Sequence, residues 1–155
     1  MLYFAYGSNM IWKQMKERCP SARFLCRARL PDYKLAFTWF SSTRKCGVAD
    51  VTPLEGSCVW GVVYQIGARD VGRLDWKEGY RPGRASNSYE PIERHVEEEG
   101  KGDRPLRVTF YVVRERTSSP LKPSQKYKRL MVDGARNWRL PEEYVRELER
   151  IEVQA

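Results

Sequence analysis

Leu2-Tyr3-Phe4-Ala5-Tyr6-Gly7-Ser8-Asn9-Met10 is the stretch from which the fold can be read. Its first five residues are an aromatic and apolar run, which predicts a buried strand. The next three residues interrupt that run, and from Met10 to Cys19 the pattern becomes helical. Ser8 or Asn9 is a natural N-cap for this helix, and Pro20 ends it. The chain is therefore expected to open as strand, glycine turn and helix.

Beyond this opening, short strand-like segments alternate with turn residues. Helices are expected over 70–78, where Gly79 stops the helix, over 124–138, where Gly134 is a point at which it can break, and over 141–151 with Pro141 at its first position. Many strands with a few segregated helices predict an α+β protein, with a small, mixed, mostly antiparallel and barrel-like sheet flanked by helices in a single domain, 1–155. The expected strands cover 23–30, 33–40, 47–52, 58–66, 89–98 and 106–113, with turns at Pro31-Asp32 and Pro53-Leu54-Glu55-Gly56.

The composition of the chain is that of a globular protein and argues against a membrane-spanning or exported one. The 155 residues carry a net charge of +8, with 41% hydrophobic and 31% charged residues, which is a globular balance. No run approaches the roughly 18 apolar residues of a membrane span, and the first residues lack the basic start of an export signal. We therefore expect a cytoplasmic protein with reduced thiols and no membrane partner. The four cysteines, none in a C-x-x-C pair, are Cys19, Cys26, Cys46 and Cys58.

The chain contains one histidine, His95. Metal sites that need two histidines are therefore excluded, and any histidine triad would have to use this residue. We expect His95 to be a half-exposed strand residue. If the protein is an enzyme, its proton carrier is then a carboxylate, a tyrosine or a lysine.

The turn Tyr6-Gly7-Ser8-Asn9 is the first candidate site. Backbone N–H groups at the start of a helix bind anions, and Gly7 allows a ligand to approach the backbone. The simpler interpretation is a plain helix cap, which this pattern by itself favours.

Glu78 is the second candidate. It lies in the last turn of a predicted helix, where the dipole and Asp75 should raise its carboxyl pKa, and burial among Trp76 and Tyr80 would raise it further. A carboxylate with a raised pKa can serve as a general base near neutral pH. The alternative is a solvated glutamate beside Lys77, and the helix pattern by itself favours that alternative.

A basic stretch near the C-terminus is the third candidate. Such a cluster, interleaved with Tyr127, is typical of proteins that bind polyanions. Acidic runs such as Glu97-Glu98-Glu99 interrupt the basic residues of the chain, and no nucleic-acid motif matches. We expect a solvated cationic surface and no nucleic-acid partner. The basic residues are Lys122, Lys126, Lys128 and Arg129.

Taken together, these segments resemble the γ-glutamylcyclotransferase family, which includes AIG2-like and BtrG-like proteins. Residues 2–10 resemble its Y-F-A-Y-G-S-N-L/M signature, and Leu74-Asp75 with Glu78-Gly79 resembles its L-D-x-x-E-G element. The resemblance spans nearly the whole chain through 20–24, 28–35, 47–49, 59–64, 124–129 and 140–144.

The resemblance implies a reaction and its residues. In a γ-glutamyl compound the α-amine attacks the γ-carbonyl of the same group, which yields 5-oxoproline and a free amine, usually an amino acid. Glu78 would be the general acid/base, and neither cofactor nor metal is implied. The residues implied to contact this small-molecule substrate are Tyr3, Phe4, Ala5, Tyr6, Gly7, Ser8, Asn9 and Tyr127.

Several alternatives stay open at this point. The substrate could be a γ-glutamylamine or a γ-glutamyl-protected biosynthetic intermediate, or the fold could be a catalytically silent anion-binding module. The segment 80–88 departs from the family pattern, and we expect it to gate the leaving-group side. The apolar face of the C-terminal helix either pairs two copies in a homodimer or packs on its own barrel, and we expect the latter.

Overall fold

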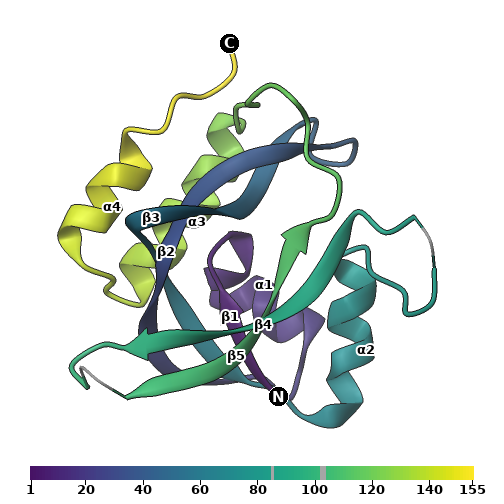
Figure 1. Cartoon of the computed structure of the whole chain (residues 1–155), viewed down its shortest axis with the longest axis vertical. Helices are drawn as coiled ribbons and strands as arrows, with labels where there is room; N and C mark the ends of the chain where they lie inside the picture. The colour runs from purple at the N-terminus through teal and green to yellow at the C-terminus, as the bar shows by residue number, and fades with distance from the viewer. Residues whose placement is uncertain (85, 102–103) are drawn as a thin grey trace.

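Five strands close into a barrel in the order β1-β3-β2-β4-β5, and helices flank it (Figure 1). The structure is a computed structural model that describes residues 1–84, 86–101 and 104–155. The predicted α+β class and barrel-like sheet are confirmed. The elements are β1 (Leu2–Ala5), the 3-10 turn η1 (Ser8–Met10), α1 (Trp12–Arg18), β2 (Arg23–Ser41), β3 (Cys46–Gln65), α2 (Ala68–Lys77), β4 (Tyr89–Glu98), β5 (Pro105–Val113), α3 (Gln125–Asn137) and α4 (Glu142–Glu149).

The barrel is mixed, as expected, because one pair of strands is parallel. β1 runs antiparallel to β3 and closes the barrel through a parallel pairing with β5 at Tyr3 and Thr109. The other pairs are antiparallel. β1 lies so close to β3 that a Cβ at Gly61 would stand 2.3 Å from the carbonyl oxygen of Ala5.

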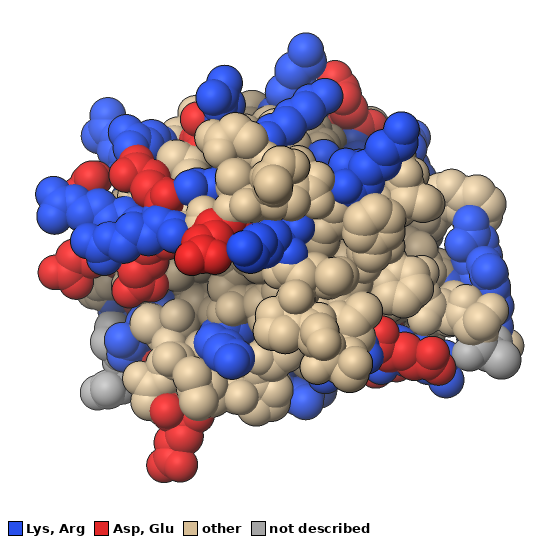
Figure 2. Space-filling model, turned by 90° about the horizontal axis from the view of Figure 1, so that it is seen from above, with Lys and Arg blue, Asp and Glu red and all other residues tan. Residues whose placement is uncertain are grey.

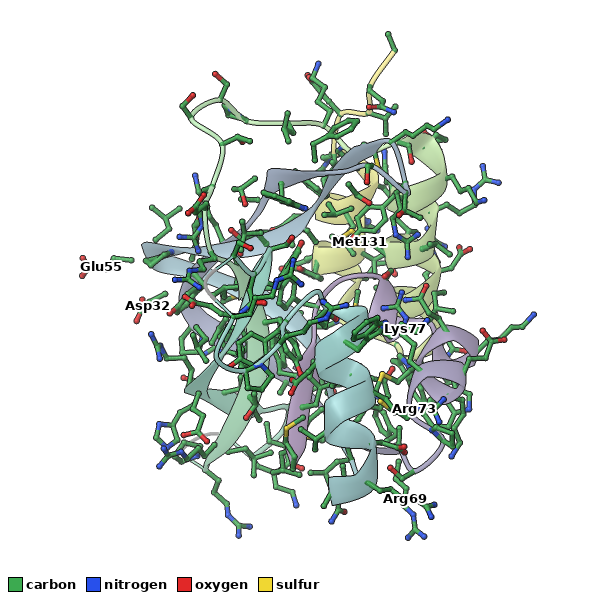
Figure 3. The ribbon with its side chains drawn as sticks, turned by 90° about the vertical axis from the view of Figure 1, so that its right-hand side faces the viewer. Asp32, Glu55, Arg69, Arg73, Lys77 and Met131 are labelled. Carbon is green, nitrogen blue, oxygen red and sulfur yellow. The ribbon has the colours of Figure 1, made fainter. Side chains whose placement is uncertain are left out.

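Four predicted strands are in fact the halves of two long ones, β2 and β3. The predicted turns at Pro31-Asp32 and at 53–56 are irregularities at which both strands bend while their pairing continues. Asp32 and Gly56 take positive φ angles of 62° and 85°, and the Gly56 N–H donates to the Asp32 carboxylate at 3.0 Å. The turn-forming residues were recognised correctly. They do not end the strands, because β2 and β3 bend at the same place and their pairing resumes on the other side of the bend. Figure 3 shows Asp32 and Glu55 together at this edge of the molecule.

The start of the first helix differs from the prediction. Ser8–Met10 forms a 3-10 turn, Ile11 is extended, and the α-helix begins only at Trp12. Neither Ser8 nor Asn9 caps a helix, because both side chains are buried and bonded elsewhere. The expected N-caps were therefore wrong, and these two polar groups are available to a site.

The C-terminal helices cover one side of the barrel, opposite α2 (Figure 1). α3 continues unbroken past Gly134, whose absent side chain leaves room for the backbone of η1. α4 begins after Pro141, which is its N-cap, and buries Tyr144, Val145 and Leu148. The apolar face of α4 thus packs on its own barrel, as expected.

Four smaller expectations can be compared with the structure. His95 is an exposed residue of β4, paired with Arg107 of β5, and the four cysteines are free thiols. In the basic stretch, Lys122 pairs with Glu152, and the Lys128 ammonium donates to the carbonyl oxygen of Ile151 at 2.9 Å. Figure 2 shows basic and acidic side chains interleaved on part of one face. Among the helices that the structure describes, none is long and apolar enough to cross a membrane.

Candidate active site

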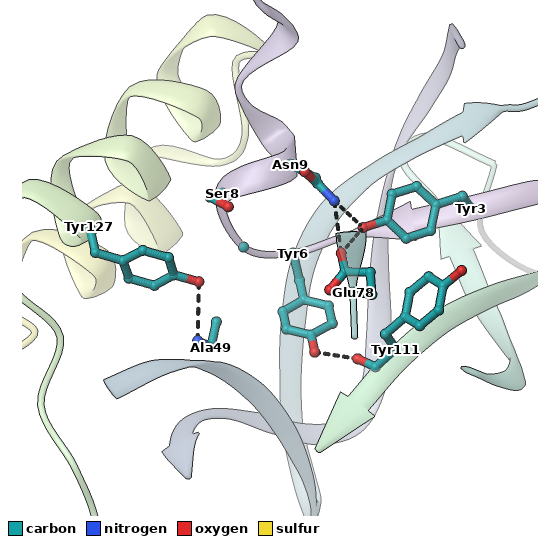
Figure 4. A pocket seen from close by; sticks show the side chains of 9 residues that line it. Tyr3, Tyr6, Ser8, Asn9, Ala49, Glu78, Tyr111 and Tyr127 are labelled. Atoms are coloured by element: carbon teal, nitrogen blue, oxygen red, sulfur yellow. Dashed lines mark hydrogen bonds between the residues drawn. The ribbon is translucent and has the colours of Figure 1, made fainter. Parts of the chain in front are cut away.

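A pocket lies where the end of β1, the end of α2 and the start of α3 meet, and seven of its residues come from the predicted set (Figure 4). They come from β1 and the turn after it, from the C-cap of α2, and from the first turn of α3. Residues far apart in the sequence therefore form one concave surface. The pocket is lined by Tyr3, Tyr6, Gly7, Ser8, Asn9, Ala49, Glu78, Tyr111 and Tyr127.

Phe4 and Ala5, which were predicted to contact substrate, do not line this pocket. Both are fully buried in the core. The Phe4 ring packs edge-on against Phe110, with ring centroids 5.9 Å apart. Successive strand side chains point to opposite faces, which turns Phe4 away from the face that Tyr3 presents to the pocket. Ala5 shares the face of Tyr3, but its side chain is fully covered within the core.

Glu78 is held at the end of α2 by a glycine-dependent helix stop. Gly79 has a φ of +73°, the Gly79 N–H donates to the Trp76 carbonyl at 3.1 Å, and the Tyr80 N–H donates to the Asp75 carbonyl at 2.9 Å. This pair of bonds is the Schellman arrangement, and it confirms the predicted stop. The backbone at Glu78 is therefore fixed, and its side chain points into the pocket.

The Glu78 carboxyl group is hydrogen-bonded from β1 and η1. Its Oε1 accepts from the Asn9 Nδ2 at 2.9 Å and from the Tyr3 hydroxyl at 3.4 Å. Burial raises the carboxyl pKa, and this outweighs the lowering effects of Arg18, Tyr3, Asn9 and Arg44. The predicted direction of the pKa shift is confirmed.

The cause of that shift differs from the prediction. The Asp75 carboxylate accepts a hydrogen bond from the Tyr111 hydroxyl and is not among the main influences on the Glu78 pKa. Trp76 is 61% exposed and stacks under the Arg81 guanidinium at 3.5 Å, so it does not bury Glu78. The residues that hydrogen-bond Glu78 come from β1 and η1, which the local helix pattern could not indicate.

Two residues of α1 orient the polar groups of η1. Asn9 Oδ1 accepts from Gln14 Nε2 at 2.9 Å and from Arg18 Nη1 at 2.8 Å. These donors settle which way the Asn9 amide points, so its NH2 group faces Glu78. Sequence reasoning missed Gln14 and Arg18, although their spacing of four residues places them on one helix face.

Hydroxyl groups complete the lining. The Tyr127 oxygen accepts from the Ala49 N–H at 3.1 Å, and Arg44 lies 5.0 Å from the centroid of the Tyr127 ring. Burial raises the pKa of Tyr127 to about 12, so this phenol stays neutral at physiological pH. Tyr111 was also missed, although strand alternation along β5 predicts which of its side chains share a face. Within 1–84, 86–101 and 104–155, no three His, Cys, Asp or Glu side chains are grouped as a metal site would need.

Of the described residues of the predicted loop 80–88, one borders the site, Ser88 at its end, beside Gly79 that precedes the loop. Gly79 and Ser88 line an outer hollow next to the pocket. The Asn87 side chain bonds the backbone of Arg81 and Arg84, which holds the described part of the loop together. A gating role for this loop stays a prediction.

A half-buried carboxyl with a raised pKa in a concave, hydroxyl-lined pocket defines a candidate enzyme of the acid–base class. The model of the AIG2-like family matches residues 58–148. The gamma-glutamylcyclotransferases of Mus musculus and Homo sapiens are each 38% identical over 156 residues, covering 97% of this chain and 78% of theirs. The chain therefore belongs to the AIG2-like γ-glutamylcyclotransferase family.

Solved structures agree with this assignment. One described as gamma-glutamyl cyclotransferase superposes with a TM-score of 0.90 at 34% identity, covering 99% of this chain and 89% of that one. YkqA from Bacillus subtilis, at 24% identity and a TM-score of 0.77, covers 99% of this chain and 56% of that one, and it shares the fold.

Proposed function

We propose that this protein is a γ-glutamylcyclotransferase that converts a γ-glutamyl amino acid into 5-oxoproline and the free amino acid. The observation that carries the proposal is the Glu78 carboxyl group, whose pKa is raised and which Asn9 and Tyr3 hold in a pocket. The family relationship supports the same reaction. The nucleophile is part of the substrate, so the protein has to supply only binding, orientation and a proton carrier.

The turn after β1 binds the γ-glutamyl headgroup. Backbone N–H groups at the start of a helical turn have no partner within that turn, so those of η1 can bind the α-carboxylate. The Ser8 oxygen accepts from Gln14 Nε2 at 2.8 Å, which leaves the Ser8 hydroxyl proton free for the substrate. The Tyr127 hydroxyl proton is likewise free for the substrate, because the Tyr127 oxygen accepts from the Ala49 N–H.

Glu78 moves one proton in each direction. Its carboxylate takes a proton from the α-ammonium group, and the amine nitrogen then attacks the γ-carbonyl carbon to give a tetrahedral intermediate. The bond from that carbon to the leaving nitrogen breaks, and Glu78 returns its proton to this nitrogen. The attacking nitrogen still carries two protons and loses one of them to the departing amine, which leaves as an ammonium ion. The products are 5-oxoproline and the leaving amine, and Glu78 is ionised again.

A direct assay tests the function. Purified protein is incubated with γ-glutamyl amino acids and γ-glutamylamines, and 5-oxoproline is measured. Product from the amino acid compounds supports the proposal, and product only from amines would reassign the substrate class. Binding without product from any compound would identify a silent anion-binding module.

We further propose that residues 1–155 form one domain. β1, from the start of the chain, closes the barrel with β5, and α3 packs on η1, which supports this organisation. Four free thiols support a reducing, cytoplasmic location. A homodimer would need a surface other than the covered apolar face of α4, and a light-scattering mass would detect it.

A further inference from the structure

Outside the inner pocket lies a wider hollow with four cationic side chains around it, which we term the basic vestibule. Arg18 comes from α1, Arg44 from the turn after β2, Lys77 from the last residue of α2 and Lys126 from the first turn of α3. Figure 3 shows Lys77 at the end of α2 that leads into Glu78, with Arg73 and Arg69 further away along the helix. Four separate elements thus bring positive charge to one place.

These four charges form no close ion pair within the described part of the chain. Among the described residues, no carboxylate lies within 4.0 Å of any of them, whereas Arg27, Arg29 and Arg107 elsewhere each pair with a glutamate. The described residues that line this hollow include no acidic side chain, and Glu78 is the one acidic side chain that lines an adjoining hollow, which shares Arg18, Arg44 and Lys77. Four cations facing one carboxylate leave an excess of positive charge that attracts an anionic ligand.

The vestibule is continuous with the inner pocket. Tyr127 lines both, and Ser8 and Glu78 line the inner pocket together with an adjoining hollow that shares Arg18, Arg44 and Lys77 with the vestibule. If the γ-glutamyl headgroup occupies the inner pocket, the substituent on its amide nitrogen has to extend into the vestibule. The leaving group is therefore the part of the substrate that meets the four cations.

Two of the four cationic side chains are held in place by other residues, and the other two are exposed and flexible. Arg18 and Arg44 are partly buried and held in place, Arg18 by Asn9 and Arg44 by its contacts with Gln14 and the Tyr127 ring. Lys77 and Lys126 are exposed, and their flexible stems can follow a ligand. Such an arrangement suits a leaving group with more than one negative charge at variable separation.

We propose that the basic vestibule selects γ-glutamyl compounds whose leaving amine carries two or more acidic groups, as an acidic amino acid does. This inference rests on the proposed cyclotransferase function and names its preferred substrate class. The vestibule lies beyond the bond that breaks, so its effect falls on substrate binding and hence on KM rather than on kcat.

The test compares γ-glutamylglutamate with γ-glutamylglutamine, which differ by one carboxylate in place of a carboxamide. We expect kcat/KM to be about tenfold higher for the acidic dipeptide at low salt, because each partly screened charge pair contributes a few-fold. This ratio should shrink as salt is added. The double variant Lys77→Gln/Lys126→Gln should lower it to about two- to threefold. Lys34→Gln, which removes one positive charge at an exposed position of β2, should keep the wild-type ratio.

The outcomes separate the two proposals. If both dipeptides yield 5-oxoproline with a ratio near one, the vestibule proposal is overturned and the cyclotransferase function stands. If neither dipeptide yields product, the proposed function is wrong. The vestibule proposal is then tested by calorimetry: it predicts that γ-glutamylglutamate binds about tenfold more tightly than γ-glutamylglutamine, and equal Kd values would overturn it. If the double variant does not fold, the salt dependence of the wild-type ratio decides, because selection by charge must weaken with salt.

Discussion

At the scale of single residues, Glu78 combines burial with a charge, and its exchange for the isosteric amide is the sharpest prediction. Glu78→Gln can still accept the hydrogen bonds from Asn9 and Tyr3, but it cannot take a proton from the substrate amine. We expect turnover to fall by about 10²- to 10⁴-fold, the usual effect of losing a general acid–base residue. Substrate should still bind, which calorimetry would measure. A folded variant that turns over at nearly the wild-type rate would rule out this mechanism.

Asp75→Asn is the matched control for Glu78→Gln. The Asp75 carboxylate accepts a hydrogen bond from the Tyr111 hydroxyl and is not hydrogen-bonded to Glu78. An asparagine oxygen at this position can still accept the bond from Tyr111. We therefore expect a loss of turnover much smaller than for Glu78→Gln. An equal loss would show that Asp75 takes part in proton transfer.

The same carboxyl group predicts a stability difference that depends on pH. Burial raises the Glu78 pKa, so the wild-type protein loses stability as pH rises through that pKa. Glu78→Gln lacks this loss. Its melting temperature should exceed that of wild type at neutral pH, and the difference should vanish below the pKa of an unfolded glutamate.

The raised pKa also sets the acidic limit of activity. Below it the Glu78 carboxyl is protonated and cannot accept the amine proton, so kcat/KM should fall as pH decreases through a value above the usual 4.5. Arg18 lowers this pKa, and Arg18→Gln should move the acidic limb to higher pH. Arg69→Gln, the same charge change at the far end of α2, serves as the control (Figure 3). An acidic limb that does not move in Arg18→Gln would contradict the electrostatic account.

At the scale of elements, the packing of α3 on η1 depends on the absence of a side chain at Gly134. A Cβ there would lie 2.7 Å from the Met10 Cβ and 2.9 Å from the Met10 carbonyl carbon. We expect Gly134→Ala to lower the free energy of unfolding by about 1–3 kcal/mol, as overpacking does. Because Met10 follows Asn9, KM should rise as well.

Gly72→Ala provides the comparison for Gly134→Ala. Gly72 also lies within a helix, but a Cβ there would meet nothing within 4 Å. Alanine should therefore stabilise the protein by about 0.5–1 kcal/mol through helix propensity. Urea unfolding of both variants measures the contrast, and equal effects would show that the η1 contact is unimportant.

At the scale of the whole molecule, Asp50 joins three strands and the segment after β5. The fully buried carboxylate accepts from the Val113 N–H at 3.0 Å, the Thr38 hydroxyl at 2.8 Å and the Arg116 Nε at 2.6 Å. We expect Asp50→Ala to lower the free energy of unfolding by about 3–5 kcal/mol, since it leaves a cation and other donors unpaired.

Glu93→Gln is the control for Asp50→Ala. It removes an exposed charge pair with Arg107 on the β4–β5 hairpin, and such pairs contribute at most about 1 kcal/mol. Urea midpoints compare the two variants. A small effect of Asp50→Ala would mean that the barrel does not depend on this junction.

Several features of this protein are determined locally and could be predicted from the sequence. The Gly79 helix stop follows from a backbone conformation that glycine favours, and it places Glu78 at the C-cap. The strand–turn opening follows from an aromatic and apolar run that Gly7 interrupts, and β4 and β5 follow from short strand-like segments between turn residues. The order of the motifs was sufficient to identify the family.

Other features depend on contacts between residues far apart in the chain, and only the tertiary structure decided them. β2 and β3 continue through prolines because each supplies the partner at the other's bend. Asn9 faces Glu78 because α1 fixes its amide, and the Glu78 carboxyl is hydrogen-bonded from β1 and η1 rather than from its own helix. Local sequence sets backbone preference, but burial and the pairing of polar groups are properties of the assembled chain.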